Sequence, residues 1–180
     1  MKKIFLTAVM LCLCIAGTHA QERKEAKNTG APERDSLAPY QKYPGLPAFN
    51  IRMMDSVTIF NTYNIPEGSP IAIFFFSPDC RHCQRTTRRL IDSMNMLKDI
   101  RFYMVTPVHS MTELHKFYEE YNLGNYENIK LVGRDYEFFF GSFYNTKMVP
   151  DLVLYDAHKK LIKLFEGETF VKDIYEAIHH

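Results

Sequence analysis

The pattern of hydrophobic and polar positions changes near the middle of the chain, from an unbroken apolar run to a helical spacing, and this change predicts the central elements of the fold. Ile71 to Phe76 is an unbroken apolar run bounded by turn residues, which is typical of a strand buried on both faces of a sheet. From Cys80 onwards, residues that suit a buried helix face recur at spacings of three and four, which predicts a helix packed on that sheet. These positions are Cys83, Thr87, Leu90, Met94 and Leu97.

The remaining pattern predicts further strands and helices around this junction. Strands are predicted at residues 48–53 and 57–63, as a hairpin, and at 101–108, 129–132, 151–155 and 160–165. Helices are predicted after the capping box that begins at Ser110, after Asp135, and after Thr169. The aromatic helix 136–144 is expected to pack over the residues around Cys80. Early crossovers and a late hairpin predict an α/β fold with a mixed central sheet and helices on both faces.

The first part of the chain has the composition of an export signal followed by a tether. Residues 1–20 combine Lys2 and Lys3 with an apolar stretch that is short for a bilayer, and they end in small residues. We expect cleavage after Ala20, a flexible tether over residues 21–42 and a folded domain over residues 43–180. The mature protein would then be periplasmic without a membrane span. Lipoprotein anchoring is not expected, because Leu precedes both early cysteines where a small residue would be required.

Cysteine usage and charge narrow the function classes further. Of the four cysteines, Cys12 and Cys14 would leave with the signal, so that only Cys80 and Cys83 remain. One closely spaced pair in an exported domain indicates a working site, since a disulfide-stapled scaffold would have several separated cysteines. Loss of Lys2 and Lys3 leaves 20 basic and 21 acidic residues, so nothing in the charge calls for a nucleic-acid or membrane-surface partner.

The spacing and position of the pair suit disulfide exchange. Two cysteines three apart on the first turn of a helix can close a disulfide, and the helix N-terminus favours a thiolate. Cys80, at the exposed helix start, is the candidate nucleophile, and Cys83 is the candidate resolving thiol. Arg81 and His82 lie between them and are candidate tuning residues, because a cationic neighbour stabilises the Cys80 thiolate and makes the disulfide more oxidising.

These features together resemble the thioredoxin-fold superfamily, and more specifically the exported TlpA/ResA-like thiol–disulfide oxidoreductases. The resemblance covers residues 44–180 and rests on four features. They are the signal sequence with Leu46-Pro47-Ala48-Phe49, the strand into Cys80-Arg81-His82-Cys83, the inserted helix and strand between Ser110 and Val132, and Met148-Val149-Pro150 before a hairpin.

The resemblance carries expectations about the site and its partners. It implies a thioredoxin-like domain in which Pro150 is cis and faces the cysteine pair, with Val149 and Pro150 binding substrate. It also implies no bound cofactor or resident metal. The expected partners are cysteine-containing exported proteins and a redox partner that recharges the pair, and the expected state is a monomer. With His82 before the second cysteine, we expect a redox potential above the value of about −270 mV typical of thioredoxin.

The sequence also departs from the family pattern. Thioredoxin has a buried acid where this chain has Phe74, and related exported reductases have a Glu where this chain has Thr86. Both acids are thought to move the proton of the buried thiol, so Asp79 or a water would have to replace them.

Two other functions remain open on the sequence alone. A periplasmic copper carrier could use Cys80, His82 and Cys83, with thioethers from Met53, Met54 or Met148. A non-catalytic binding domain could retain the fold without the chemistry. The arginines Arg85, Arg88 and Arg89 are interpreted as a solvated helix face rather than a recognition surface.

Overall fold

The computed structural model describes residues 37–179. The predicted signal peptide, its cleavage after Ala20 and most of the predicted tether lie outside these residues. In chain order the helices and strands are α1 (Pro39–Lys42), β1 (Asn50–Met53), β2 (Ile59–Asn61), β3 (Ile71–Phe75), α2 (Arg81–Asp92), β4 (Arg101–Thr106), α3 (Met111–Glu120), β5 (Ile129–Arg134), α4 (Phe139–Tyr144), β6 (Asp151–Tyr155), β7 (Leu161–Glu166) and α5 (Val171–His179). Short 3-10 turns cover Thr62–Asn64, Met94–Leu97 and Leu123–Asn125.

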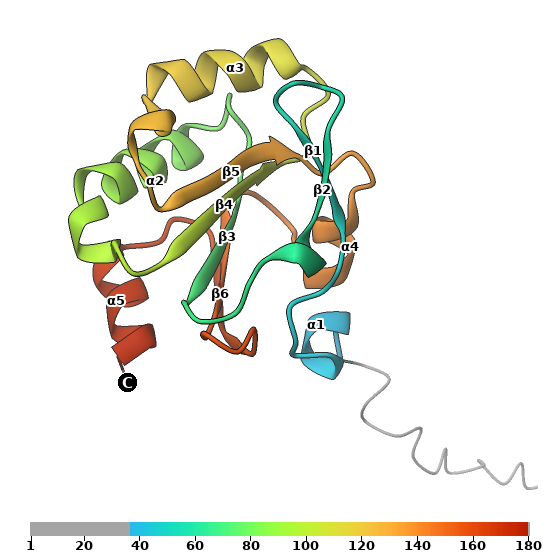
Figure 1. The fold of residues 1–180 in the computed structure, drawn as a ribbon, viewed down its shortest axis with the longest axis vertical. Helices are drawn as coiled ribbons and strands as arrows, with labels where there is room; N and C mark the ends of the chain where they lie inside the picture. The colour runs from blue at the N-terminus through green and yellow to red at the C-terminus, as the bar shows by residue number, and fades with distance from the viewer. Residues whose placement is uncertain (1–36, 180) are drawn as a thin grey trace, which may run out of the picture. The chain divides into compact units, whose positions relative to one another are not determined.

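The strands of this region form one mixed sheet in the order β2-β1-β5-β4-β3-β6-β7 (Figure 1). β3, β4 and β5 run parallel, while β6 pairs antiparallel with β3 and β7, and β1 pairs antiparallel with β5 and β2. Every residue of β3 is buried, as expected for a strand covered on both faces. Because β3 is central and leads directly into α2, the sheet fixes the start of that helix.

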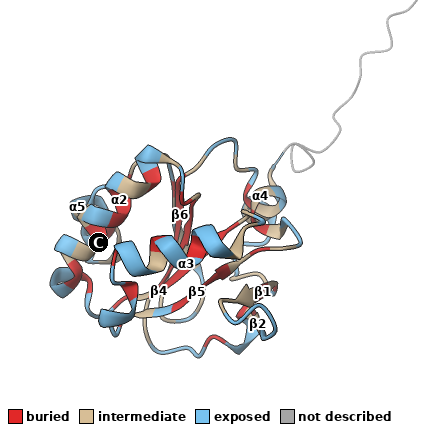
Figure 2. Cartoon of the chain, turned by 90° about the horizontal axis from the view of Figure 1, so that it is seen from above, coloured by how far each residue is buried: buried red, intermediate tan, exposed pale blue. Residues whose placement is uncertain are grey.

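Helices α2, α3 and α5 cover one face of the sheet, on the left and top of Figure 1. Their apolar residues pack with Phe74 and Phe76 into one core cluster that also contains Cys83. Figure 2 shows the same helices as mixtures of buried and exposed residues beside the buried central strands. The stripe predicted from Cys83 to Leu97 is buried along its whole length, although α2 ends at Asp92 and a 3-10 turn continues it.

The other face of the sheet is covered by α4 and the N-terminal segment. Phe140 and Tyr144 of α4 pack with Phe75 and Tyr155, and the Phe75 and Phe140 rings stack with centroids 4.2 Å apart. The buried side chains of α4 therefore lie across the sheet from Cys83, and the expectation that this helix packs over the cysteine pair is wrong. The helices thus lie on both faces, as the sequence predicts.

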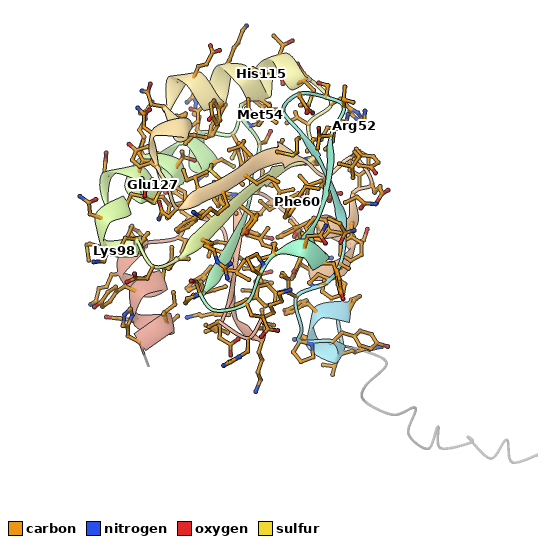
Figure 3. All side chains as sticks on the ribbon, in the orientation of Figure 1. Arg52, Met54, Phe60, Lys98, His115 and Glu127 are labelled. Carbon is orange, nitrogen blue, oxygen red and sulfur yellow. The ribbon has the colours of Figure 1, made fainter. Side chains whose placement is uncertain are left out.

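The N-terminal hairpin closes one edge of the fold. β1 and β2 pair as predicted, and the turn between them is tied to α3, where the His115 ring nitrogen Nε2 lies 3.0 Å from the Met54 carbonyl oxygen (Figure 3). Residues 39–42, which the sequence assigns to the tether, form α1 instead. Tyr40 packs against Tyr144 with ring centroids 5.9 Å apart, so the ordered region begins before residue 43.

Candidate active site at the start of α2

Cys80 caps the N-terminus of α2, and Cys83 lies on the first turn of that helix. The Cys80 backbone is extended, at φ −80° and ψ 114°, and its sulfur accepts a hydrogen bond from the Cys83 N–H at 3.2 Å. Both side chains are free thiols in this structure, with Cys80 half-buried and Cys83 buried. The arrangement leaves Cys80 partly accessible and buries Cys83 on the adjoining first turn of the helix.

The segment before β6 faces the accessible sulfur. The Val149–Pro150 peptide bond is cis, as the resemblance implied. The Cys80 thiol donates to the Val149 carbonyl oxygen at 3.6 Å, and the Gly167 N–H donates to the Pro150 carbonyl oxygen at 2.8 Å. Three segments that are far apart in the sequence, at Cys80, Val149 and Gly167, therefore meet at one end of the sheet.

Burial is the main influence on the second thiol. Desolvation raises the pKa of Cys83 well above its ordinary value, and the neighbouring Cys80 side chain raises it further. The Ser77 N–H donates to the Cys83 sulfur at 3.5 Å. Cys83 is thus held as a neutral thiol below the surface, which suits a resolving thiol that reacts only after its partner.

No carboxylate occupies the positions at which the related families carry an acid. Phe74 is completely buried and stacks on Phe76, and the Thr86 side chain is also completely buried. Asp79 is exposed, and its carboxylate accepts a hydrogen bond from the Ser77 hydroxyl. Asp79 is therefore connected to Cys83 through Ser77, whose N–H contacts the buried sulfur.

Glu168 is a charged residue at the site that sequence reasoning missed. Its carboxylate lies 2.6 Å from His82 Nδ1, accepts from Arg85 Nε at 3.1 Å and from Arg89 Nη1 at 2.7 Å, and also accepts from Arg85 Nη2. The hydrogen bond from Arg85 is the largest cause that lowers the pKa of Glu168, to about 2. No local signal identifies this contact, because 86 positions separate His82 from Glu168.

Arg81 and His82, the two residues between the cysteines, have different surroundings. The His82 ring nitrogen Nδ1 is engaged by Glu168 and also lies 2.8 Å from Arg85 Nη2. The Arg81 side chain is exposed. Arg85 and Arg88 are exposed, as expected for a solvated helix face. Arg85 and Arg89 also converge on Glu168, and Arg88 lies 3.7 Å from Glu120.

The donor set for the alternative metal carrier is not gathered into a site. Within residues 37–179, no group of three or more His, Cys, Asp or Glu side chains is placed to hold a metal ion. His82 directs Nδ1 to Glu168, and Cys83 is enclosed among apolar residues. The geometry suits thiol chemistry at Cys80 better than coordination by Cys80, His82 and Cys83.

Comparison with known proteins identifies a family and several solved structures to which this chain is similar. The model of the thioredoxin-like domain family matches residues 63–180. A comparison with curated protein sequences gave no significant match. Among solved structures, a secreted Mycobacterium tuberculosis disulfide oxidoreductase homologous to E. coli DsbE is 17% identical, with a TM-score of 0.59 over 73% of this chain and 94% of that chain.

Two further structures have the same fold at similar distances in sequence. StoA from Bacillus subtilis is 13% identical, with a TM-score of 0.57 over 74% of this chain and 98% of that chain. The thioredoxin domain of a thiol-disulfide oxidoreductase from Bacteroides vulgatus is 17% identical, with a TM-score of 0.57 over 73% of this chain and 91% of that chain. These likenesses and the family match confirm the predicted thioredoxin-like fold.

Proposed function

Since the chain belongs to the thioredoxin-like domain family, we propose that it is an exported thiol–disulfide oxidoreductase that exchanges a Cys80–Cys83 disulfide or dithiol with the cysteines of other exported proteins. One observation carries this proposal. The half-buried Cys80 sulfur, at the N-terminus of α2, faces the Val149 carbonyl oxygen at 3.6 Å, and the buried Cys83 thiol lies one helical turn away.

The exchange needs only these two sulfurs. The Cys80 thiolate attacks one sulfur of a substrate disulfide, a Cys80–substrate bond forms, and the other substrate sulfur leaves as a thiolate. Cys83 then gives its proton to water and attacks the Cys80 sulfur; the bond from Cys80 to the substrate breaks, the Cys80–Cys83 disulfide forms, and the second substrate sulfur leaves as a thiolate. Two electrons pass from the pair to the substrate, and the reverse sequence oxidises a substrate dithiol.

The surroundings of Cys80 suit an extended substrate segment. Met148, directly before Val149, is 70% exposed. An exposed apolar side chain next to the segment that faces the nucleophile provides contact area for a bound chain. Val149 and Pro150 would bind the substrate backbone. A second protein would recharge the pair, because no cofactor takes part in the exchange.

Export is part of the proposal and rests on the sequence of residues 1–20, together with the secreted relative above. None of the helices between Leu37 and His179 combines the length and the hydropathy needed to cross a bilayer.

Capture of the mixed disulfide tests the proposal. Cys83→Ser leaves the nucleophile but removes the resolving thiol, so the variant should accumulate a covalent adduct at Cys80 when it is incubated with a protein disulfide. Cys80→Ser is the matched control and should form none. Intact mass spectrometry after acid quenching measures the adduct. Equal adduct in both variants, or in neither, would refute Cys80 as the nucleophile.

A further inference from the structure

The contacts of Glu168 bear on how the proposed exchange is tuned. Its carboxylate lies on the segment after β7, next to Gly167, whose N–H is bonded to the Pro150 carbonyl oxygen. From there it reaches across to α2, where it binds His82, Arg85 and Arg89. The Glu168 side chain is only 22% exposed, against 46% for Arg85 and 63% for His82, so the carboxylate is less exposed than these two side chains that it binds.

We propose that Glu168 is a positioning residue of the exchange reaction: it binds His82 and Arg85 and thereby limits the positive charge that these side chains present to Cys80. This inference rests on the proposed function and concerns the same site. It names a residue outside the Cys-x-x-Cys motif as a determinant of the redox potential.

Arg85 connects the carboxylate to the nucleophile. Its pKa is raised chiefly by the hydrogen bond with Glu168, and the negative charge of Cys80 raises it as well. The Arg85 guanidinium therefore binds Glu168 directly and acts on Cys80 only through its charge, when Cys80 is a thiolate. Positive charge that Glu168 neutralises is not available to stabilise that thiolate. His82 Nδ1 lies within hydrogen-bonding distance of Glu168 and of Arg85, so the same carboxylate fixes the ring that the sequence assigned to tuning Cys80.

The direction of the effect follows from the charges. Removing the carboxylate leaves Arg85, and His82 when it is protonated, free to stabilise the Cys80 thiolate. Stabilising the thiolate stabilises the reduced form, so the disulfide becomes more oxidising. Glu168 thus opposes the increase in redox potential that is expected from His82 alone. The wild-type potential lies below the value that the motif would give with the carboxylate absent.

Glu168→Gln tests this role, and the chain offers a matched control. Glu120→Gln also removes one carboxylate that faces an arginine of α2, in this case Arg88 at 3.7 Å. Each variant is equilibrated with glutathione, and iodoacetamide alkylation of Cys80 is followed against pH. We expect Glu168→Gln to shift the equilibrium towards the dithiol about tenfold, or ~30 mV, and to move alkylation to lower pH. Glu120→Gln should stay within about twofold of wild type.

A further variant identifies the route of the effect. In an Arg85→Gln background, Glu168→Gln should shift the equilibrium less than half as much on a logarithmic scale, because the main cation that it releases is gone. An undiminished shift would overturn the proposed route. If the wild-type pair shows a reversible redox couple but Glu168→Gln behaves like Glu120→Gln, the role of Glu168 is refuted while the proposed function stands. A wild-type pair with no reversible couple would overturn the proposed function as well.

Discussion

Thr86 offers a sharp test of the structure next to the cysteine pair. Its side chain is completely buried on the face of α2 that carries Cys83, and its hydroxyl oxygen has no hydrogen-bond partner within residues 37–179. Thr62 is equally buried, but its hydroxyl accepts from the Phe49 N–H at 2.9 Å and donates to the Pro47 carbonyl oxygen at 2.6 Å. The same substitution, Thr→Val, should therefore have opposite effects at the two positions.

The magnitudes follow from these contacts. A buried polar group without a partner costs about 1–3 kcal/mol, and Val fills nearly the same space as Thr with a similar helix propensity. Thr86→Val should raise the free energy of unfolding by about 1 kcal/mol, which corresponds to an increase of ~3 °C in Tm for a domain of this size. Thr62→Val leaves the Phe49 N–H unpaired and should lower the free energy of unfolding by about 1–3 kcal/mol.

Urea unfolding monitored by circular dichroism measures both changes, and disulfide exchange with glutathione measures activity. Because Thr86 is bonded to neither cysteine, Thr86→Val should leave the exchange rate within about twofold of wild type, in contrast to loss of a proton-transferring group, which costs about 10²–10⁴-fold. Two results would refute the reasoning. A loss of stability like that of Thr62→Val would show that the Thr86 hydroxyl is bonded in solution, and a large loss of exchange rate would show that it moves the Cys83 proton.

Three further predictions concern the rest of the domain. Arg85 and its neighbours lower the pKa of Glu168 to about 2, so the stabilising contribution of this carboxylate is present above the ordinary pKa of 4.5 and is lost as the pH falls towards 2. In Glu168→Gln, the free energy of unfolding measured with urea should therefore depend less on pH between these values. A pH dependence like that of wild type in the variant would contradict this. Asp135→Ala removes the acceptor for two N–H groups at the start of α4, at 3.1 and 2.8 Å, and should lower the free energy of unfolding by about 1–2 kcal/mol. An unchanged urea unfolding curve would show that these two hydrogen bonds do not stabilise α4. In Gly133→Ala the new Cβ would lie 2.7 Å from the Arg52 carbonyl oxygen, so we expect the free energy of unfolding to fall by about 1–3 kcal/mol. An unchanged Tm in thermal unfolding would mean that β1 and β5 move apart more easily than this packing implies.

The elements that carry the cysteine pair could be predicted because their signals are local. The apolar run at Ile71–Phe76, the spacing after Cys80 and the Ser110 capping box each specify structure within a few residues. The structure agrees: β3 is buried throughout, Cys80 caps α2, and the Ser110 hydroxyl accepts from the Glu113 N–H at 3.2 Å.

The features that the sequence did not reveal depend on tertiary contacts. α1 is ordered where Tyr40 packs against Tyr144, and α4 starts only at Phe139 because Phe138 adopts a left-handed backbone with φ 55°. The side of the sheet that α4 covers depends on which apolar faces remain open, which periodicity alone does not specify. Glu168 joins the site across 86 positions, and nothing near it in the sequence marks it as a partner of His82.

The most direct test of the central claim is the redox equilibrium of the Cys80–Cys83 pair against glutathione, with acid trapping and mass spectrometry. The account predicts a reversible two-electron couple, absent in Cys80→Ser, with a potential above the value of about −270 mV typical of thioredoxin. A potential well below that value would refute the oxidising character expected from His82 and indicate a reductase. The absence of any reversible couple, with copper or zinc retained by the pair instead, would contradict the account and favour a metal carrier.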